Sequence, residues 1–390
     1  MNFIAWFSIL AIVMGTAALI LVLSVFNGFE GLVKSLYSSF YTDLKILPAS
    51  GKTLTLSQAQ LQQIKGIRDI KNFSLVVEEK AMLQNGDYQS VIDLKGVDDN
   101  YRYVTGVEDH LRDDAKYNVG TEDDPMLILG SGVEAALGVQ ANKNIFYLQI
   151  YLPRKNKTEQ LDPLNDITSD SIGTSSAFVI QQDFDNRYAI TNLDFVKRAL
   201  RLDSDQYSGA EIALLDPSKA SDVQARLKKV LGTNYLVQTR YQQNQSLYSI
   251  MNLERWIIYG VLCLVLVVAS FTMIGALTML VLEKRKDVNV LHSLGATRSF
   301  IQKVFLSEGL LLGIIGTVLG MLLALLIGYL QIKYHLIKLE GGSFLIDYFP
   351  VQLKLTDFLL VGATVFVIAL LASWIPSRKA ARQEFSLRSE

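Results

Sequence analysis

The sequence predicts a membrane protein with four transmembrane α-helices and a large α+β domain inserted between the first and the second helix. Half of the 390 residues are apolar, and they cluster in four long blocks. Each block can cross a hydrocarbon core of about 30 Å as a helix. Most of the charge lies between the first two blocks, where strand and helix patterns alternate. The net charge of −1 indicates no nucleic-acid partner.

The four apolar blocks are the predicted spans. They cover Phe3–Phe26, Trp256–Leu282, Leu306–Leu330 and Phe358–Ile375. The first block lacks a basic leader and a small-residue cleavage site, so we interpret it as an uncleaved span rather than a signal peptide. The predicted organisation is span one with its extension (1–42), an external domain (43–255, with a strand-rich insert at about 125–190) and a membrane domain (256–390).

The orientation follows from Lys and Arg near the span ends. The segment between spans two and three and the tail after span four are both basic, with Lys284, Arg285 and Lys286 in the first and Arg378 and Lys379 in the second. Basic segments of this kind stay in the cytoplasm. Both chain termini are therefore expected inside, and the large domain outside.

Small residues recur at every third or fourth position of the third span. Gly309, Gly313, Gly316 and Gly320 form a stripe along one helix face. In lipid, small residues let helix backbones approach closely. The stripe predicts packing against another helix, in this chain or in a second copy. The general tolerance of membrane helices for glycine is the alternative.

The segment Glu283–Thr297, EKRKDVNVLHSLGAT, predicts a short helix over 284–295 beneath the membrane. Val288, Val290, Leu291 and Leu294 are spaced to form one apolar strip. Gly295 is placed to end the helix, and Thr297 can cap the helix that follows. The strip either lies on lipid or docks into a groove on a soluble protein.

The sequence of the external domain predicts alternating strands and helices. A hairpin is expected around Asn85-Gly86, a strand ending at Pro153, and helices after Ser57 and Ser218. The segment Asp162–Ser176 is polar and rich in turn residues. It predicts a loop or hairpin tip, with a partner-binding loop as the alternative.

The residue inventory argues against several activities. The lone cysteine, Cys263, excludes an internal disulfide, and the three histidines follow no ligand spacing, so no metal site is expected. The acidic residues between Glu108 and Asp124 lack the spacing of a calcium loop. The motifs of hydrolases and of phosphate-binding loops are missing from the sequence. We expect neither enzymatic activity nor a cofactor bound by this chain.

Six stretches carry a resemblance to a known family. They are GTAALILVLSVFNGFE, LILGSGVEAALGV, YQQNQSLYSIMNLERW, EKRKDVNVLHSLGAT, FLSEGLLLGIIGTVLG and LLASWIPSRKAAR. With one span, a large external domain and three more spans, the chain resembles the MacB/FtsX-like permeases of ABC transporters. Within that group it is similar to the LolC/LolE transmembrane subunits of lipoprotein-releasing complexes in the inner membrane of Gram-negative bacteria, whose large domain is periplasmic.

The resemblance implies partners and sites. It implies a separate LolD-like ATPase dimer, which holds ATP and Mg²⁺, a second permease subunit, a lipoprotein substrate in contact with membrane lipid, and a LolA-like periplasmic carrier. The coupling helix would use Lys286, Asp287, Leu291, His292, Leu294, Gly295 and Ala296. The substrate cavity would use Val22, Phe26, Tyr259, Leu262 and Leu266. A carrier-binding loop would use Pro163, Asn165, Asp166 and Ile167.

Two departures leave alternatives open. Relatives usually carry a basic amphipathic helix before span one, so the natural chain starts either at Met1 or upstream of it. The segment Asp162–Ser176 does not match the carrier-binding hook of LolC, so the subunit is LolC-like, LolE-like or a single type that combines both roles, in a homodimer or a heterodimer. Rival functions are a macrolide or peptide exporter subunit, a division regulator that transmits force, or a membrane-anchored receptor without an ATPase.

Overall fold

The computed structural model describes residues 3–153, 167–339 and 346–382. The chain divides into two compact units. The first, here called the helical unit, comprises Met1–Val33 and Ser249–Glu390. The second, here called the sheet unit, comprises Lys34–Tyr248. The division falls inside two long helices rather than at the predicted boundaries of residues 43 and 255, because helical backbone continues beyond both apolar blocks.

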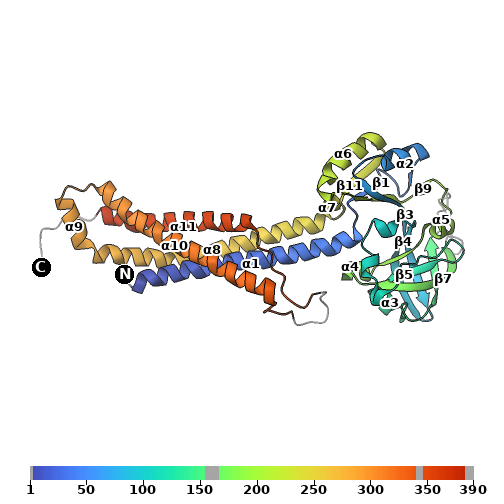
Figure 1. Cartoon of the computed structure of the whole chain (residues 1–390), viewed down its shortest axis with the longest axis horizontal. Helices are drawn as coiled ribbons and strands as arrows, with labels where there is room; N and C mark the ends of the chain where they lie inside the picture. Colours follow the sequence, from blue (N-terminus) through green and yellow to red (C-terminus); the bar gives the residue numbers. More distant parts are fainter. Residues whose placement is uncertain (1–2, 154–166, 340–345, 383–390) are drawn as a thin grey trace. The chain divides into compact units, whose positions relative to one another are not determined.

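In the described part of the helical unit, four long helices pack together (Figure 1). They are α1 (Phe3–Phe40), α8 (Gln245–Glu283), α10 (Arg298–Tyr334) and α11 (Leu355–Ala381). All four are long and apolar enough to cross a membrane. Their shared core contains Leu19, Leu23, Leu266, Met273 and Val365. The short helix α9 (Arg285–Ser293) joins α8 to α10.

One half of the sheet unit is an open sheet covered by helices. Its strand order is β11 (Tyr235–Thr239), β1 (Leu44–Pro48), β10 (Gly209–Leu214) and β3 (Ile70–Asn85), all antiparallel. Helices α2 (Gln58–Lys65) and α6 (Ala220–Leu231) supply Ile64, Val223 and Leu227 to its core. This half carries both predicted strand–helix–strand patterns, so the α+β class is confirmed.

The other half is a closed ring of strands. β3 continues into it and pairs with β4 (Tyr88–Val97), and the order then runs β8 (Tyr188–Asn192), β5 (Met126–Gly130), β7 (Ile167–Phe178) and β6 (Tyr147–Pro153). The far end of β3 pairs with β6 and closes the ring, with Leu83 opposite Ile150. Helices α3 (Ser131–Ala136) and α5 (Leu193–Leu200) join its core. The strand-rich insert predicted at 125–190 is therefore continuous with β3 and β4.

Shorter elements complete the sheet unit. The strands β2 (Leu54–Thr55) and β9 (Gln206–Tyr207) pair with each other, and the one-turn helices α4 (Gln182–Asp185) and α7 (Arg240–Gln243) lie near β5 and β11. Four 3₁₀ turns are also described, at Tyr101–Tyr103, Glu108–His110, Arg112–Asp114 and Pro217–Lys219.

Several predicted local structures are confirmed. β3 and β4 form a hairpin in which Asn85 pairs with Tyr88 across the turn. The hydroxyl of Ser57 accepts from the N–H of Gln60 and the Gln60 side chain reaches back to the N–H of Ser57, which is a capping box at the start of α2. β6 ends at Pro153 and α6 ends before Gly232, as their sequences predict.

The segment 162–176, predicted as a loop or hairpin tip, is a strand throughout its described part. Residues 162–166 lie outside the described residues, but β7 begins at Ile167 and runs through residue 176. Ile172, Thr174 and Ser176 are fully buried between β5 and β6. The polar composition suggested a loop, whereas pairing on both edges and a buried face made this segment a strand.

Candidate coupling helix and helix-packing sites

The helix α9 ends in a defined stop. Gly295 has a φ of +93°, in the left-handed region where a side chain would be strained. The N–H of Ala296 donates to the carbonyl of Leu291 (3.0 Å), as in a Schellman motif. The hydroxyl of Thr297 then caps α10. The chain therefore leaves α9 and enters α10 through a hydrogen-bonded turn.

One residue anchors α9 to the helical unit. Val288 is 2% exposed, whereas most of the helix around it is exposed. It lies in an apolar cluster with residues from the ends of α8, α10 and α11, namely Val281, Ile301, Phe305 and Ala380. Dispersion contacts in such a cluster hold the side chain in one place. Val288 therefore joins α9 to the ends of three long helices.

The opposite face of α9 is apolar and exposed. Val290 is 60% exposed and Leu294 is 79% exposed. Asp287, which shares this face because it lies seven residues before Leu294, forms an exposed ion pair with Lys284 (3.0 Å). The prediction of one continuous apolar strip is wrong. The strip is divided because Val288 turns toward the long helices while Val290 and Leu294 turn away.

The remaining predicted coupling residues lie between these faces. Leu291, His292 and Ala296 are half-buried, and Lys286 is exposed. The arrangement offers a pair of apolar side chains flanked by charges on a short, anchored helix. Helix-in-groove recognition uses apolar anchors at this spacing. The geometry therefore suits docking into a shallow groove on another protein.

The segment Asn27–Glu30, NGFE, acquires a role only in the structure. Asn27 is fully buried and donates to a carboxylate oxygen of Asp357 in the first turn of α11, and Arg255 of α8 pairs with the other oxygen at 2.6 Å. A Cβ at Gly28 would lie 2.2 Å from the carbonyl oxygen of Pro350, so only glycine permits this approach. The motif thus ties α1, α8 and α11 together through one buried carboxylate.

The glycine stripe of α10 packs against helices of the same chain. A Cβ at Gly309 would lie 2.2 Å from Ser373 Oγ of α11, and one at Gly313 would lie 2.6 Å from Ala369 Cβ. Further along, Cβ atoms at Gly316 and Gly320 would lie 2.8 Å from Ile12 and 2.7 Å from Thr16 of α1. The stripe therefore lets α10 approach both α1 and α11 closely.

The five predicted cavity residues do not share one exposed face. Val22 is 40% exposed, and Phe26 is half-buried. Tyr259 and Leu262 are partly buried against the helix core, and the Tyr259 hydroxyl is hydrogen-bonded to Thr364. Leu266 is 3% exposed and fills the space beside Gly15 of α1. Leu266 is therefore a packing residue of the helical unit. The periodicity of apolar residues in a sequence does not distinguish such a packing residue from one that lines a cavity.

Two protein-family models match this chain. The model of the MacB-like periplasmic core domain matches residues 5–155, and that of the FtsX-like permease C-terminal domain matches residues 259–385. LolE of the lipoprotein-releasing system of Haemophilus influenzae is 29% identical, over 97% of this chain and 92% of the relative. LolC of Neisseria meningitidis is 25% identical, over 98% of this chain and 93% of the relative.

The chain is a LolC/LolE-type permease. It is a multi-pass membrane protein, and its sheet unit is a large periplasmic domain. Among solved structures, the periplasmic region of MacB from Actinobacillus actinomycetemcomitans is 11% identical with a TM-score of 0.37, over 56% of this chain and 98% of that one.

The predicted carrier-binding loop of this permease is only partly described. Pro163, Asn165 and Asp166 lie outside the described residues. Ile167 is the first residue of β7 and is 49% exposed, opposite Pro153 at the end of β6. It therefore lies at the rim of the strand ring.

A buried charge network in the periplasmic domain was not predicted from the sequence. Lys95 of β4 is 1% exposed, and its Nζ lies 2.6 Å from Glu211 of β10 and 3.2 Å from Glu78 of β3. Lys45 of β1 also pairs with Glu78, at 2.8 Å. The ring of Phe40, at the end of α1, lies 5.1 Å from the Lys95 ammonium. The network connects the open sheet with the closed ring.

The network changes the pKa values of its members. Burial alone would raise the pKa of Glu78, but the charges and hydrogen bonds of Lys45 and Lys95 outweigh it and lower this pKa to about 2. Burial would likewise lower the pKa of Lys95, and Glu211 together with Glu78 raises it well above the ordinary lysine value. Both groups are therefore charged at neutral pH, and their charge is part of the fold.

Proposed function

We propose that this permease extracts lipoproteins from the outer leaflet of the inner membrane of a Gram-negative bacterium and passes them to a LolA-like periplasmic carrier, driven by a separate ATPase. Relatives named as transmembrane proteins of lipoprotein-releasing systems align with nearly the whole chain. The observation that carries the mechanism is α9, a short helix with one anchored face and one exposed apolar face.

The exposed face of α9 would dock on a LolD-like ATPase dimer. That partner would bind ATP and Mg²⁺ and hydrolyse the nucleotide, while this chain contributes Val290 and Leu294 as anchors. Movement of the ATPase would reach α8, α10 and α11 through the buried contacts of Val288. The Lys and Arg residues near α9 and at the end of α11 support a cytoplasmic location for this side.

Acyl chains set the energetic problem for extraction. Moving them into water costs about 0.8 kcal/mol per methylene, so several chains cost tens of kcal/mol. A route between apolar surfaces avoids most of this cost. α1 and α8 expose large apolar side chains, among them Val22, Val261 and Phe271. We propose that these faces, together with those of a second permease subunit, form the apolar surface that receives the acyl chains.

The test is a charge on the exposed face of α9. Leu294 is the most exposed of its apolar residues, so Leu294→Glu leaves the internal packing intact. In vesicles that contain both permease subunits, the ATPase and a lipoprotein, we expect release to a soluble carrier to fall at least about ten-fold, which corresponds to a loss of about 1.4 kcal/mol in coupling.

The matched control is Leu215→Glu in the periplasmic domain. Leu215 is 66% exposed, and the substitution is chemically identical. The control should release lipoprotein at the wild-type rate. If Leu294→Glu also released at that rate while the ATPase remained bound, α9 would not be the coupling element.

A further inference from the structure

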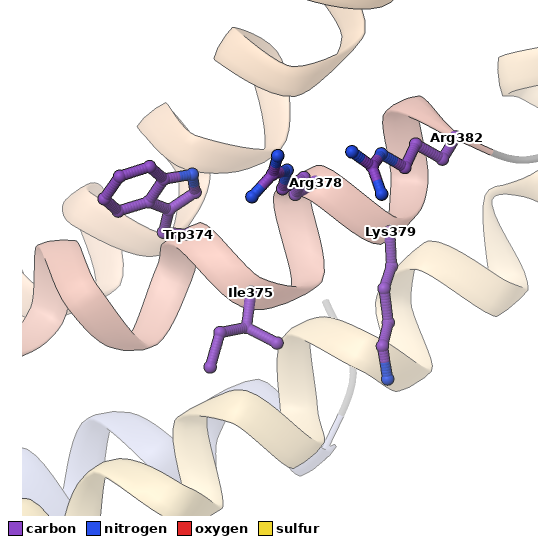
Figure 2. Close-up of a pocket in the computed structure, with 5 residues that line it drawn as sticks. All are labelled: Trp374, Ile375, Arg378, Lys379 and Arg382. Carbon is purple, nitrogen blue, oxygen red and sulfur yellow. The ribbon is translucent and has the colours of Figure 1, made fainter.

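The last two turns of α11 line a cavity of about 580 Å³ at one end of the helical unit. Its lining residues are Trp374, Ile375, Arg378, Lys379 and Arg382 (Figure 2). Figure 2 shows the guanidinium groups of Arg378 and Arg382 extending from the same side of the helix as the Trp374 indole, while Ile375 and Lys379 extend from the other side. Both sides of the helix end therefore pair an apolar residue with a cation.

The three cations are unpaired within the part of the chain that the structure describes. No described carboxylate lies within 4.0 Å of Arg378, Lys379 or Arg382. In the same unit, Arg255 pairs with Asp357 and Lys284 pairs with Asp287. Three positive charges around a cavity, with no described carboxylate beside them, favour an anionic ligand.

The order of residues along α11 indicates which kind of anion the cavity would bind. Trp374 and Ile375 are 50% and 55% exposed, and Arg378 and Lys379 each lie four residues further along, one turn beyond them on the same face. Going along the helix, an exposed apolar band gives way to an indole and then to cations. This is the sequence of environments across a membrane boundary, from acyl chains to headgroups.

We propose that this cavity binds the headgroup of an anionic phospholipid, with the phosphate held by Arg378 and Arg382 and the acyl chains lying along Trp374 and Ile375. Two guanidinium groups suit phosphate oxygens because each can donate two parallel hydrogen bonds. An acidic groove on a soluble protein would satisfy the cations but would leave the exposed indole and isoleucine in water. The site requires only that α11 crosses the membrane, and it is independent of lipoprotein release.

Trp374 itself provides the measurement. The chain has three tryptophans, so Trp6→Phe and Trp256→Phe leave Trp374 as the single fluorophore. The full chain is reconstituted into vesicles that contain brominated phosphatidylglycerol or brominated phosphatidylcholine at equal mole fraction. Bromine quenches only neighbouring indoles. We expect the anionic lipid to bind about five-fold more strongly beside Trp374, as one favourable cation contact implies.

Paired variants separate the site from general surface charge. The double substitution Arg378→Gln with Arg382→Gln should abolish the preference for phosphatidylglycerol over phosphatidylcholine. The double substitution Arg378→Lys with Arg382→Lys should retain most of this preference. Arg298→Gln with Lys303→Gln removes two exposed cations from α10 that do not line the cavity, and it should leave the preference unchanged. Equal quenching by both lipids in the single-tryptophan protein that keeps Arg378 and Arg382 would overturn the proposal, whatever the variants do.

Two further arms identify other occupants. If inorganic phosphate abolished the preference, at an ionic strength matched with chloride, the site would bind small anions rather than lipid. If the double glutamine variant lost binding of the soluble ATPase and kept its lipid preference, the cavity would be a protein-docking surface. Either result would contradict the proposal.

Discussion

The two units of this permease achieve a unique packing in different ways. In the helical unit, α10 meets α1 and α11 through glycine, alanine, serine and threonine, and one buried carboxylate ties three helix ends. In the sheet unit, a closed ring of strands surrounds an apolar core, and Lys95 bridges two carboxylates where this ring meets the open sheet. Lipid provides no hydrophobic drive for helix association, so close approach and polar ties select the partners there. In water, apolar burial provides the drive.

The largest effect is expected from breaking the charge network. Lys95→Ala leaves Glu211, whose side chain is 3% exposed, without its nearest cation. Loss of one partner of a buried pair costs about 3–5 kcal/mol. The sheet unit should unfold at correspondingly lower denaturant, as measured by near-ultraviolet circular dichroism of its tyrosines. The tryptophan fluorescence should change little, because all three tryptophans lie in the helical unit.

A compensated variant sharpens this result. Lys95→Met combined with Glu211→Leu removes both charges, so most of the lost stability should return. If Lys95→Ala alone were as stable as the wild type, the network would contribute nothing to the fold of the sheet unit.

Close helix packing is the corresponding weak point of the helical unit. At Gly320 an added Cβ would lie 2.7 Å from Thr16 Cβ and 2.8 Å from the Val13 carbonyl oxygen, and the backbone atom cannot rotate away. Gly320→Ala should therefore destabilise this unit by about 2 kcal/mol, as overpacking does. The measurement is tryptophan fluorescence during detergent denaturation.

Gly275→Ala is the matched control for that substitution. Gly275 lies in α8, and a Cβ there would meet nothing within 4 Å, so the variant should denature like the wild type. Equal destabilisation by both substitutions would show that helix flexibility, rather than close approach, matters at these positions.

The smallest effect is expected from acid, which should lower the stability of the sheet unit. The pKa of Glu78 is lowered to about 2 in the folded state, so its stabilising contribution is complete above the unfolded value of about 4.5 and is lost as the pH falls toward 2. Because this side chain is 30% exposed, we expect a loss on the order of 1–2 kcal/mol in the sheet unit. Glu78→Gln should flatten the pH dependence measured by circular dichroism. A pH dependence that the variant leaves unchanged would assign it to another group.

Hydropathy and local motifs predicted much of this architecture. The four spans, the hairpin at Asn85 and the helix start at Ser57 follow from interactions within a few residues, which a single sequence displays directly. The stop at Gly295 is of the same kind. These features depend on backbone conformation and local hydrogen bonds, so distant parts of the chain do not alter them.

The features that were missed depend on distant neighbours. Lys95 is one charged residue in a strand, and only the return of β10 and α1 buries it. Val288 and Leu294 are equally apolar in the sequence, and the ends of three other helices decide which of them is covered. The polar strand beginning at Ile167 likewise exists because β5 and β6 pair with it.

The placement of the glycine stripe has a consequence for any second subunit. Because α1 and α11 of the same chain already occupy the stripe, a partner permease must meet other surfaces, where bulky residues such as Leu10, Met14 and Leu264 are exposed. A seam between bulky apolar side chains can part at little cost, since lipid tails replace the contacts that are given up. In an assembly with a second permease, such a boundary would open toward the bilayer and close again, while the glycine-packed interior of each subunit would keep its shape.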